Sequence, residues 1–288
     1  MRVVQITDTH VPADPRDQTV LDMLCAVETV DPVVNLQIIL DDIRTLDPAP
    51  DFVIATGDLA DRGHPASYHR LRTLLQPLEV PVYASPGNHD LADELARHLP
   101  GGNVAVVEAI ECDGWQFVFA DAGNTEWGEL SAAQVTRLDH LMTNRDVDNV
   151  FLCIHHPPVA VHHGVMPAPQ FLADDLAPLL RAHPVRAIAS GHVHSVADLE
   201  LDGVPVHTGP STYLGAPGPG YRIFDFDGDD YQTRAHTFSL FTMNDDQRAR
   251  LIEASRRRAR EHGAPVRGLQ DDARALVVEW QANTAHRA

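Results

Sequence analysis

Five short apolar runs, each followed directly by a polar motif, constrain this chain more than any other feature. Runs of β-branched and apolar residues that end at Gly, Asp or Pro predict buried strands. In open α/β sheets, ligand-binding side chains collect outside the carboxyl ends of such strands. The runs are 3–6, 52–55, 80–83, 150–154 and 187–189, and the motifs are Asp8-Thr9-His10, Gly57-Asp58, Gly87-Asn88-His89-Asp90, His155-His156 and Gly191-His192-Val193-His194. The sequence therefore predicts an α/β fold with one shared binding site.

The residue types in these motifs favour a centre with two divalent metal ions. The candidate ligands are Asp8, His10, Asp58, Asn88, His155, His192 and His194. Mixed oxygen and imidazole ligands suit manganese, iron, zinc or cobalt, and the lack of a thiolate argues against a closed structural zinc site. Two such ions carry about four positive charges, of which two Asp carboxylates remove about two. The remaining charge suits a hydroxide and an anionic phosphoester, with in-line attack at phosphorus.

The ordered motifs resemble those of the calcineurin-like metallophosphoesterases. The resemblance is carried by Asp8-Thr9-His10, by the run from Gly57 to Gly63, by Gly87-Asn88-His89-Asp90, by His155-His156-Pro157-Pro158 and by Gly191-His192-Val193-His194. Within this superfamily the chain looks most similar to the class III cyclic nucleotide phosphodiesterase and glycerophosphodiesterase group. The resemblance implies a four-layer α/β/β/α sandwich of two mixed sheets flanked by helices.

The same resemblance implies a role for each site residue. One ion is expected to be held by Asp8, His10, Asp58 and His194, and the other by Asp58, Asn88, His155 and His192. Asp58 would bridge the two ions, because its two carboxylate oxygens can serve both. His89 would donate to a phosphoryl oxygen or protonate the leaving alkoxide. The expected reaction is hydrolysis of small phosphodiesters, such as cyclic nucleotides or glycerophosphodiesters, by a metal-bound hydroxide.

Several alternatives stay open at the level of sequence. A phosphomonoesterase or nucleotidase needs extra cationic donors, for which Arg62 and Arg222 are the candidates. A non-catalytic scaffold with this fold is a second alternative, although the complete ligand set argues against it. Gly57-Asp58 and Gly87-Asn88 also suit ordinary turns. The role of His162 and His163, in the Pro-rich stretch 157–169, is open between a lid and a plain loop. Ser211-Thr212-Tyr213-Leu214 stands where some glycerophosphodiesterase-like members have a His, which weakens that substrate assignment.

The net charge limits the classes of binding partner, and the cysteine content indicates the cellular compartment. A formal charge of −19 disfavours duplex nucleic acid and anionic membranes, which need a basic surface. It is compatible with a small anionic substrate, because the metal ions would set the local field. The three cysteines, Cys25, Cys112 and Cys153, are widely spaced and odd in number, which favours reduced thiols and a cytoplasmic protein. A strand expected within three residues of Met1 leaves no room for a signal peptide, and the apolar runs are too short to span a bilayer.

Alternating helices and strands are expected along the rest of the chain. Helical periodicity or capping indicates helices at 33–46, 65–76, 91–99, 131–142 and 171–182, with Ser131 as an N-cap. Further strands are expected at 104–107 and 115–120. Two hairpins are expected, 199–201 with 204–207 and 221–226 with 231–236, turning at Asp202-Gly203 and Asp227-Gly228.

Two regions are expected: a catalytic domain at 1–240 and a helical carboxyl-terminal extension at 241–288. Asn244 is a candidate N-cap for a helix that ends near Gly263, and a second helix is expected at 271–283. These helices either pack on the catalytic body or form a dimerisation element or a flap over a neighbour's active site. The second alternative predicts a homo-oligomer.

Overall fold

Two six-stranded mixed sheets lie face to face in the computed structural model, which describes all residues except 15, 18, 20–29, 162–170, 240–241 and 262–288. The first sheet has the order β12-β11-β1-β2-β3-β4 and the second has the order β5-β6-β7-β8-β10-β9. The strands are β1 (Arg2–Ile6), β2 (Phe52–Thr56), β3 (Val82–Ser85), β4 (Val104–Val106), β5 (Ala109–Cys112), β6 (Trp115–Ala120), β7 (Asn149–Ile154), β8 (Val185–Ser190), β9 (Ala197–Leu201), β10 (Val204–Thr208), β11 (Gly220–Asp227) and β12 (Asp230–Thr237).

Parallel pairing dominates the centre of each sheet. β1 to β4 run parallel, and β11 runs antiparallel to both β1 and β12. In the second sheet β6, β7, β8 and β10 run parallel, while β5 and β9 pair antiparallel at the two edges. Parallel strands have their carboxyl ends at the same sheet edge, so the loops that follow β1, β2 and β3 are neighbours, as are those that follow β7 and β8.

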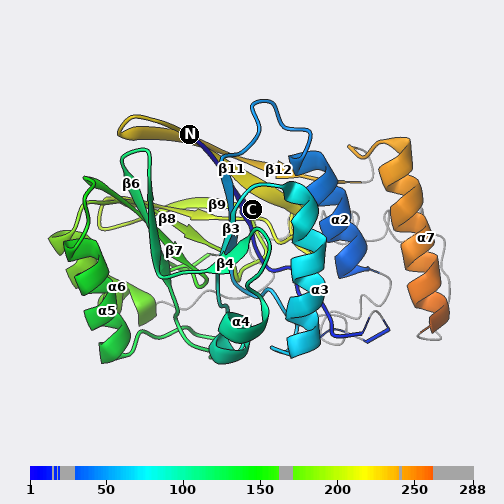
Figure 1. Cartoon of the computed structure of the whole chain (residues 1–288), viewed down its shortest axis with the longest axis horizontal. Coiled ribbons are helices and arrows are strands. Elements are labelled where there is room, and N and C mark those ends of the chain that lie inside the picture. The colour runs from blue at the N-terminus through cyan, green and yellow to red at the C-terminus, as the bar shows by residue number, and fades with distance from the viewer. Residues whose placement is uncertain (15, 18, 20–29, 162–170, 240–241, 262–288) are drawn as a thin grey trace, which may run out of the picture.

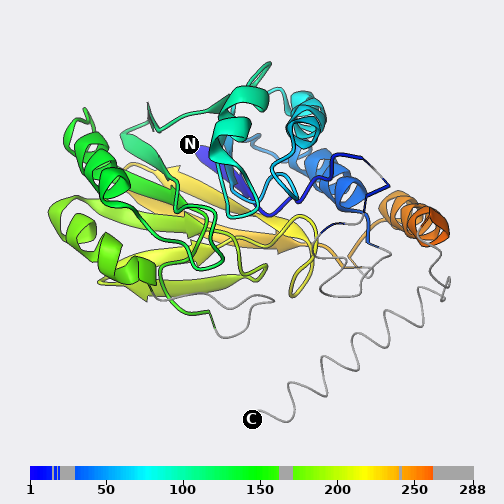
Figure 2. The same cartoon turned by 90° about the horizontal axis from the view of Figure 1, so that it is seen from below.

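Helices cover the outer face of each sheet, as Figures 1 and 2 show. The helices are α2 (Pro32–Ile43), α3 (Pro65–Leu75), α4 (Ala92–His98), α5 (Ala132–Thr143), α6 (Phe171–Ala182) and α7 (Asp245–Glu261), with a short 3₁₀ turn at Gln76–Leu78. α2 and α3 contribute to the apolar core on the first sheet. α5 and α6 contribute to the core on the second sheet. The expected four-layer α/β/β/α sandwich is therefore confirmed.

A third apolar core, rich in aromatic rings, fills the space between the sheets. It contains Phe52 from the first sheet and Phe117 and Phe151 from the second. The rings of Phe52 and Phe117 meet edge to face with centroids 5.0 Å apart. Such a pair contributes roughly 0.5–1.5 kcal/mol beyond the burial of its area. The alternation of buried faces along the parallel strands thus fixes how the sheets are stacked.

The expected elements agree with the structure where local signals are strong. The Ser131 side chain accepts from the Gln134 amide while the Gln134 side chain accepts from the Ser131 amide, so α5 begins with a capping box. Asn244 and Gln247 form the same reciprocal pair at the start of α7. The expected helix at 271–283 and the residues Cys25, His162 and His163 lie outside the described residues.

Two expectations about elements need correction, and one strand was not expected. The strand placed at 80–83 is β3, Val82–Ser85, which starts after Pro81, a residue that has no amide hydrogen to pair. The second hairpin turns at Gly228-Asp229, because Asp227 pairs with Asp230. Strand β5 was missed, although Asp113 and Gly114, both with positive φ, form the turn that joins it to β6.

The described part of the carboxyl-terminal region contains α7, which lies beside α2 in Figure 1. Arg257 donates to Asp31 over 2.9 Å and Arg250 donates to Asp41 over 2.7 Å. Asp31 is also the N-cap of α2, where it accepts from the amides of Val33 and Val34. Within the described residues, no helix combines the length and the apolar character needed to cross a membrane.

Candidate metal centre

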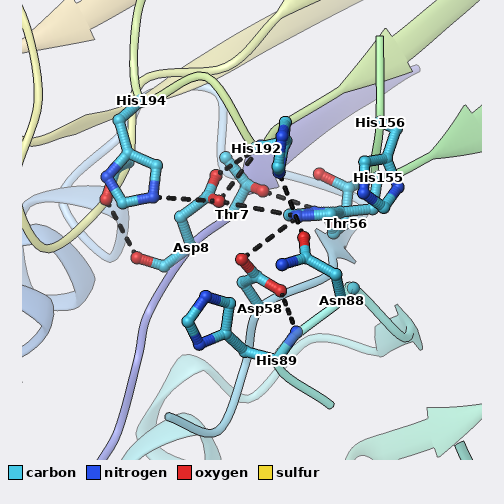
Figure 3. A network of polar contacts seen from close by, with 12 residues as sticks. Thr7, Asp8, Thr56, Asp58, Asn88, His89, His155, His156, His192 and His194 are labelled. Atoms are coloured by element: carbon cyan, nitrogen blue, oxygen red, sulfur yellow. Dashed lines mark hydrogen bonds and ion pairs between the residues drawn. The ribbon is translucent and has the colours of Figure 1, made fainter. Parts of the chain in front are cut away.

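The structure brings the five motifs together at one end of the sandwich. Asp8 and His10 follow β1, Asp58 follows β2, and Asn88 follows β3. His155 follows β7, and His192 and His194 follow β8. Figure 3 shows the side chains of Asp8, Asp58, Asn88, His155, His192 and His194 converging from the two sheets. Residues separated by up to 186 positions, Asp8 and His194, are thus in contact, with His194 Nε2 3.2 Å from Asp8 Oδ1.

Five of the seven expected ligands adopt a left-handed backbone. The φ angles are 54° at Asp8, 43° at His10, 50° at Asp58, 66° at His192 and 50° at His194. Such angles cost non-glycine residues of order 1–3 kcal/mol each and persist only when the surroundings determine them. Here the surroundings include backbone hydrogen bonds of 3.0 Å from Asp8 to Gly57 and from His10 to Asp58. Concentrated strain of this kind is typical of a functional site.

Two glycines let the backbone pass close to the ligands. A Cβ at Gly87 would collide with the Asp58 amide and carboxylate. A Cβ at Gly191 would collide with the Thr7 hydroxyl and lie 2.6 Å from Asp8 Oδ2. Neither glycine needs a positive φ, so the requirement at these positions is for space.

Asp8, His10 and His194 form the first group that could hold a metal ion. All are buried, and one ligand atom from each lies within 4.8 Å of the others. The Nδ1 of His194 donates to the Leu214 carbonyl over 2.6 Å, which leaves its Nε2 as the free lone pair. That Nε2 lies 3.3 Å from the Nε2 of His10. A backbone carbonyl that fixes the tautomer is a common companion of metal-binding histidine.

Asp58, His155 and His192 form a second group, with ligand atoms again within 4.8 Å. His155 Nδ1 donates to the Thr56 carbonyl over 2.8 Å, so its Nε2 faces inward toward Asp58. This buried Nε2 makes no hydrogen bond, although Asp58 Oδ2 is 3.2 Å away. A buried polar atom without a hydrogen bond is costly, and a cation between the two would satisfy both. Asn88 joins this group, since its Oδ1 lies 3.0 Å from His192 Nδ1.

Asp58 lies between the two groups. Its Oδ2 is 3.7 Å from His10 Nε2 and 3.2 Å from His155 Nε2, while its Oδ1 accepts from the His89 amide over 2.8 Å. His10, Asp58 and His89 also have ligand atoms within 4.8 Å of one another. The position of Asp58 therefore fits the bridging role that was expected for it.

The electrostatics of the centre favour added positive charge. Burial disfavours the charged form of Asp58, but the neighbouring His155 holds its pKa well below the usual range. For His155, burial acts to lower the pKa, but Asp58 and Asp8 outweigh it and raise the pKa to about 9. Burial and the nearby His155 lower the pKa of His192 to about 4. The buried carboxylates of Asp58 and Asp8 thus stabilise a proton on His155. A divalent cation at this position would neutralise more of their negative charge.

His89 lies at the partly exposed side of the group. Its Nδ1 donates to the Asp61 carbonyl over 3.0 Å, which leaves Nε2 as the atom that can exchange a proton. Its ring meets the His10 ring edge to face, with centroids 4.7 Å apart. The expected role of His89 toward a substrate stays a prediction.

Asp90, the last residue of the Gly87-Asn88-His89-Asp90 motif, supports the centre from behind. Its buried carboxylate accepts from the amides of Leu59, Ala60 and Gly87 at 2.9–3.0 Å and from the Tyr68 hydroxyl at 3.0 Å. It thereby joins the loop that carries Asp58 to the loop that carries Asn88. Burial raises the pKa of Asp90 to about 6, and the Asp58 charge acts in the same direction, whereas the three amides favour the carboxylate. The signal in the sequence was an Asp directly after Gly-Asn-His.

The two arginines proposed as extra cationic donors differ in position. Arg222 is buried and donates to Asp198 over 2.8 Å, to the Thr208 carbonyl over 3.2 Å, and to other groups between the sheets. The expectation that Arg222 is available to a substrate is therefore wrong, because its guanidinium is enclosed and used. Arg62 has a side chain that is 57% exposed, with its Nε 3.3 Å from Asp61 Oδ2.

His156 is a second residue whose function the sequence did not reveal. Its Nε2 donates to the Thr125 carbonyl over 3.1 Å, and its ring lies 4.5 Å from the His192 ring. Burial and the nearby His155 lower the pKa of His156 to about 2, so the ring is neutral. His156 thus connects the expected ligand His192 to the loop between β6 and α5.

Comparison with known proteins agrees with this geometry. The family model described as calcineurin-like phosphoesterase matches residues 1–196. A 3′,5′-cyclic-nucleotide phosphodiesterase of Nostoc sp. is 26% identical over 242 residues, which cover 83% of this chain and 82% of the relative. A protein of Arcobacter nitrofigilis named as a probable glycerophosphodiester phosphodiesterase is 32% identical, with 68% and 73% covered. A dimetal phosphatase structure from Danio rerio shares the fold with a TM-score of 0.59 at 16% identity, covering 82% of this chain and 95% of the other.

Proposed function

The chain belongs to the calcineurin-like phosphoesterase family, and from this premise we propose that it is a dinuclear metal-dependent phosphodiesterase of small diesters. Cyclic nucleotides and glycerophosphodiesters are the substrate classes that the names of its relatives suggest. The observation that carries the proposal is the presence of two neighbouring ligand groups, Asp8 with His10 and His194, and Asp58 with His155 and His192.

Members of this family use two divalent metal ions, and each residue of the centre has a proposed part in holding them. Asp8, His10, Asp58 and His194 would bind one ion, and Asp58, Asn88, His155 and His192 the other. The mixture of imidazole nitrogens and carboxylate or amide oxygens suits manganese, iron, zinc or cobalt. Ions bound there would lower the pKa of a bound water and stabilise the charge that develops at phosphorus.

Catalysis also requires a proton for the leaving alkoxide. His89 is suited to this because the Asp61 carbonyl fixes its tautomer and the ring is only partly buried. The His89 amide also donates to Asp58 Oδ1 over 2.8 Å, which holds His89 beside the carboxylate proposed to bridge the ions. His89 would therefore face the phosphoester while its backbone stays fixed beside the bridging carboxylate.

Diesters are favoured over monoesters by the distribution of positive charge. A dianionic monoester needs cationic donors beyond the metal ions, and Arg222 is enclosed between the sheets. Arg62 lies against Asp61, which offsets part of its charge. Most of the positive charge at the centre would then come from the ions, which suits a monoanionic diester.

A matched pair of substrates tests the proposal. Catalytic efficiency on bis(p-nitrophenyl) phosphate should exceed that on p-nitrophenyl phosphate, at one pH and with saturating manganese, because the leaving group is the same. Metal analysis of the same sample should give two ions per chain. If the monoester is hydrolysed more efficiently, the phosphomonoesterase alternative replaces the diesterase. Protein that binds no metal would instead indicate a scaffold.

Three further expectations remain proposals about the whole chain. Residues 241–288 would form an extension of a catalytic domain at 1–240, and the described ion pairs of α7 with α2 support packing on the catalytic body. A homo-oligomer formed through the carboxyl-terminal helices and a cytoplasmic location stay predictions, the first of which light scattering of the full chain would test.

A further inference from the structure

We propose that Ser211, on the chain between β10 and β11, is a positioning residue for one metal ion, the ion assigned to Asp8, His10, Asp58 and His194. This ion is called the first ion below, and its neighbour the second ion. The inference rests on the proposed dinuclear function and goes beyond it, because it gives the two ions separate supports within the fold. Residues 211–216 are called the 211–216 segment.

The Ser211 hydroxyl uses its full hydrogen-bonding capacity on backbone groups. A hydroxyl has one donor and two acceptor sites. Ser211 Oγ donates to the Asp8 carbonyl over 2.9 Å and accepts from the amides of Tyr213 and Leu214 over 3.0 and 3.2 Å. The side chain is fully buried, so its loss would leave these three backbone groups without their partner. One small side chain therefore joins the loop that carries Asp8 to the 211–216 segment.

The same hydroxyl acts on His194 through Leu214. The Leu214 amide donates to Ser211, and the Leu214 carbonyl accepts from His194 Nδ1 over 2.6 Å. The bond from His194 selects the tautomer whose Nε2 is free to bind a metal ion, which is the usual part of a carbonyl beside a ligand histidine. Ser211 thus holds the residue that orients His194.

Further contacts place the 211–216 segment against the ligands of the first ion. The Ala216 amide donates to the His194 carbonyl over 3.0 Å. A Cβ at Gly215 would collide with the same carbonyl, so the segment lies directly on the backbone of His194. The ring of Tyr213 is buried, and its centroid is 6.1 Å from that of the His10 ring. The segment therefore contacts or borders all three ligands that belong to the first ion alone.

The 211–216 segment is also anchored to α2. Asn35 of α2 is buried, and its Nδ2 donates to the Tyr213 carbonyl over 2.8 Å. This bond and the three bonds of Ser211 hold the segment at separate points. Loss of either support should let the segment shift away from His194.

The ligands of the second ion have other supports. His155 is oriented by the Thr56 carbonyl, and Asp90 accepts from the Gly87 amide on the loop that carries Asn88. Neither contact involves the 211–216 segment, so loss of the Ser211 hydroxyl should weaken the first ion and leave the ligands of the second in place. Because the two ions would share a bridging carboxylate, a change at one also affects the other. The test therefore compares pairs of variants.

The test measures manganese content per chain by equilibrium dialysis, at a free concentration about ten times the higher wild-type Kd. A lost support of a ligand histidine costs about 10–100-fold in metal affinity, which would lower the occupancy of the first ion from about 0.9 to about 0.5 or less. Wild type should hold nearly two ions, and Ser211→Ala should lose about half an ion or more.

Two double variants identify which ion is lost. His194→Ala removes a ligand of the first ion, and Asn88→Ala removes a ligand of the second. Added to His194→Ala, the change Ser211→Ala should cost little further metal, because the first ion is already weakened. Added to Asn88→Ala, it should cost about half an ion more, because the first ion is then the one that remains.

Thr233→Val is the matched control. The Thr233 hydroxyl on β12 donates to the Ile223 carbonyl over 2.9 Å and accepts from Arg222 over 3.2 Å. This variant also loses hydrogen bonds of a hydroxyl, so it should melt at a lower temperature while keeping both ions. If Ser211→Ala does not fold, Asn35→Ala takes its place in the same pairings, since it releases the same segment at α2.

Several outcomes overturn the inference. Full metal content in Ser211→Ala does so, as does a loss that Thr233→Val shows equally. A further loss on top of His194→Ala, with none on top of Asn88→Ala, would place the effect of Ser211 at the second ion and so contradicts the assignment. A wild type that holds fewer than two ions at saturating manganese contradicts the dinuclear proposal itself, before any variant is compared.

Discussion

At the scale of single residues, the centre depends on side chains that are fixed by backbone contacts as much as by one another. His155 and His194 each donate from Nδ1 to a carbonyl, so both present Nε2 to the carboxylates. Asp58 then has imidazoles from both groups within reach of one oxygen. Because this oxygen is shared, the two ions should not bind independently.

Replacing Asp58 tests this coupling. Asp58→Asn keeps the shape of the side chain and removes its charge, so both ions should bind far more weakly. Activity should fall at least as much as the roughly 10²–10³-fold cost of losing one electrostatic stabiliser. Metal content by mass spectrometry and turnover of a diester measure the two effects. Asp47→Asn, a change at an exposed carboxylate, is the control, and two ions per chain with normal turnover in Asp58→Asn would falsify the bridging role.

The proposed acid role of His89 gives a different signature. His89→Ala should leave metal content near normal and slow the cleavage of alkyl diesters by roughly 10²–10⁴-fold. The loss should be smaller for nitrophenyl leaving groups, which need little protonation. Rates on a series of leaving groups of differing pKa measure this dependence. A loss of the same size across the series would assign His89 to stabilising a phosphoryl oxygen.

Sequence alone identified the ligand candidates but not what holds them. The side-chain types and their place after apolar runs are local signals, so Asp8, Asn88 and His192 could be singled out. The tether at Asp90 depends on Leu59, which lies 31 residues away, and the left-handed backbone depends on pairing between loops. The expectation that Arg222 is available to a substrate was wrong for the same reason, since its burial arises only once the two sheets are stacked.

At the scale of elements, a cluster at the side of the sandwich joins the two sheets. His207 of β10 meets Asp198 of β9 through Nδ1 and the Tyr231 hydroxyl of β12 through Nε2, each over 2.7 Å. Arg222 of β11 donates to the same Asp198. Because a carboxylate only accepts, Nδ1 donates to Asp198, and in the neutral ring Nε2 accepts from the Tyr231 hydroxyl; burial of the ring favours this neutral form.

This preference for the neutral ring predicts that acid destabilises the fold. Burial lowers the pKa of His207, with the charge of Arg222 acting in the same direction and Asp198 opposing it. The unfolded chain therefore binds a proton first, near pH 6.5, and the stabilisation present above that pH is lost as the pH falls toward the folded pKa. Urea unfolding at pH 7.0 and 5.5 should show a smaller loss for His207→Gln than for wild type. The difference is bounded by about 1.4 kcal/mol per pH unit for one proton. If the free energy of unfolding depends on pH equally in the two proteins, His207 is not the cause of the acid sensitivity.

Elements were recovered from sequence where their signals are local. Ser131 and Asn244 cap their helices as expected, because a cap acts within three residues of itself. β5 is four residues long and only partly buried, so no apolar run marks it. Its one signal, Asp113-Gly114, is of the same kind that identified the turn at Asp202-Gly203.

At the scale of the whole molecule, the metal centre lies where the sheets meet. Asp8, His10, Asp58 and Asn88 come from the first sheet, and His155, His192 and His194 from the second. Each proposed ion would therefore bind both sheets, and binding to the folded state alone raises stability.

Removing the ions should thus weaken the fold as a whole. If the free concentration of an ion is about 100 times its Kd, removing that ion lowers the free energy of unfolding by about 2.7 kcal/mol. Chelator-treated protein should melt at a lower temperature than loaded protein, and manganese should restore the difference. Asp58→Asn should show little response to the chelator. Identical melting of loaded and chelated wild type would mean that the ions do not join the sheets.

The origin of the ligands in both sheets also makes the chemistry conditional on assembly. Neither half of the chain carries a full set, since Asp8 lies beside His194 and Asp58 beside His155 only after the halves have docked in register. A newly synthesised or damaged chain whose sheets have not docked would therefore be inactive. It would not hydrolyse phosphoesters with reduced selectivity. The protein can therefore act only when both sheets have folded and docked. For the same reason, activity reports whether two separately produced halves of the chain have associated.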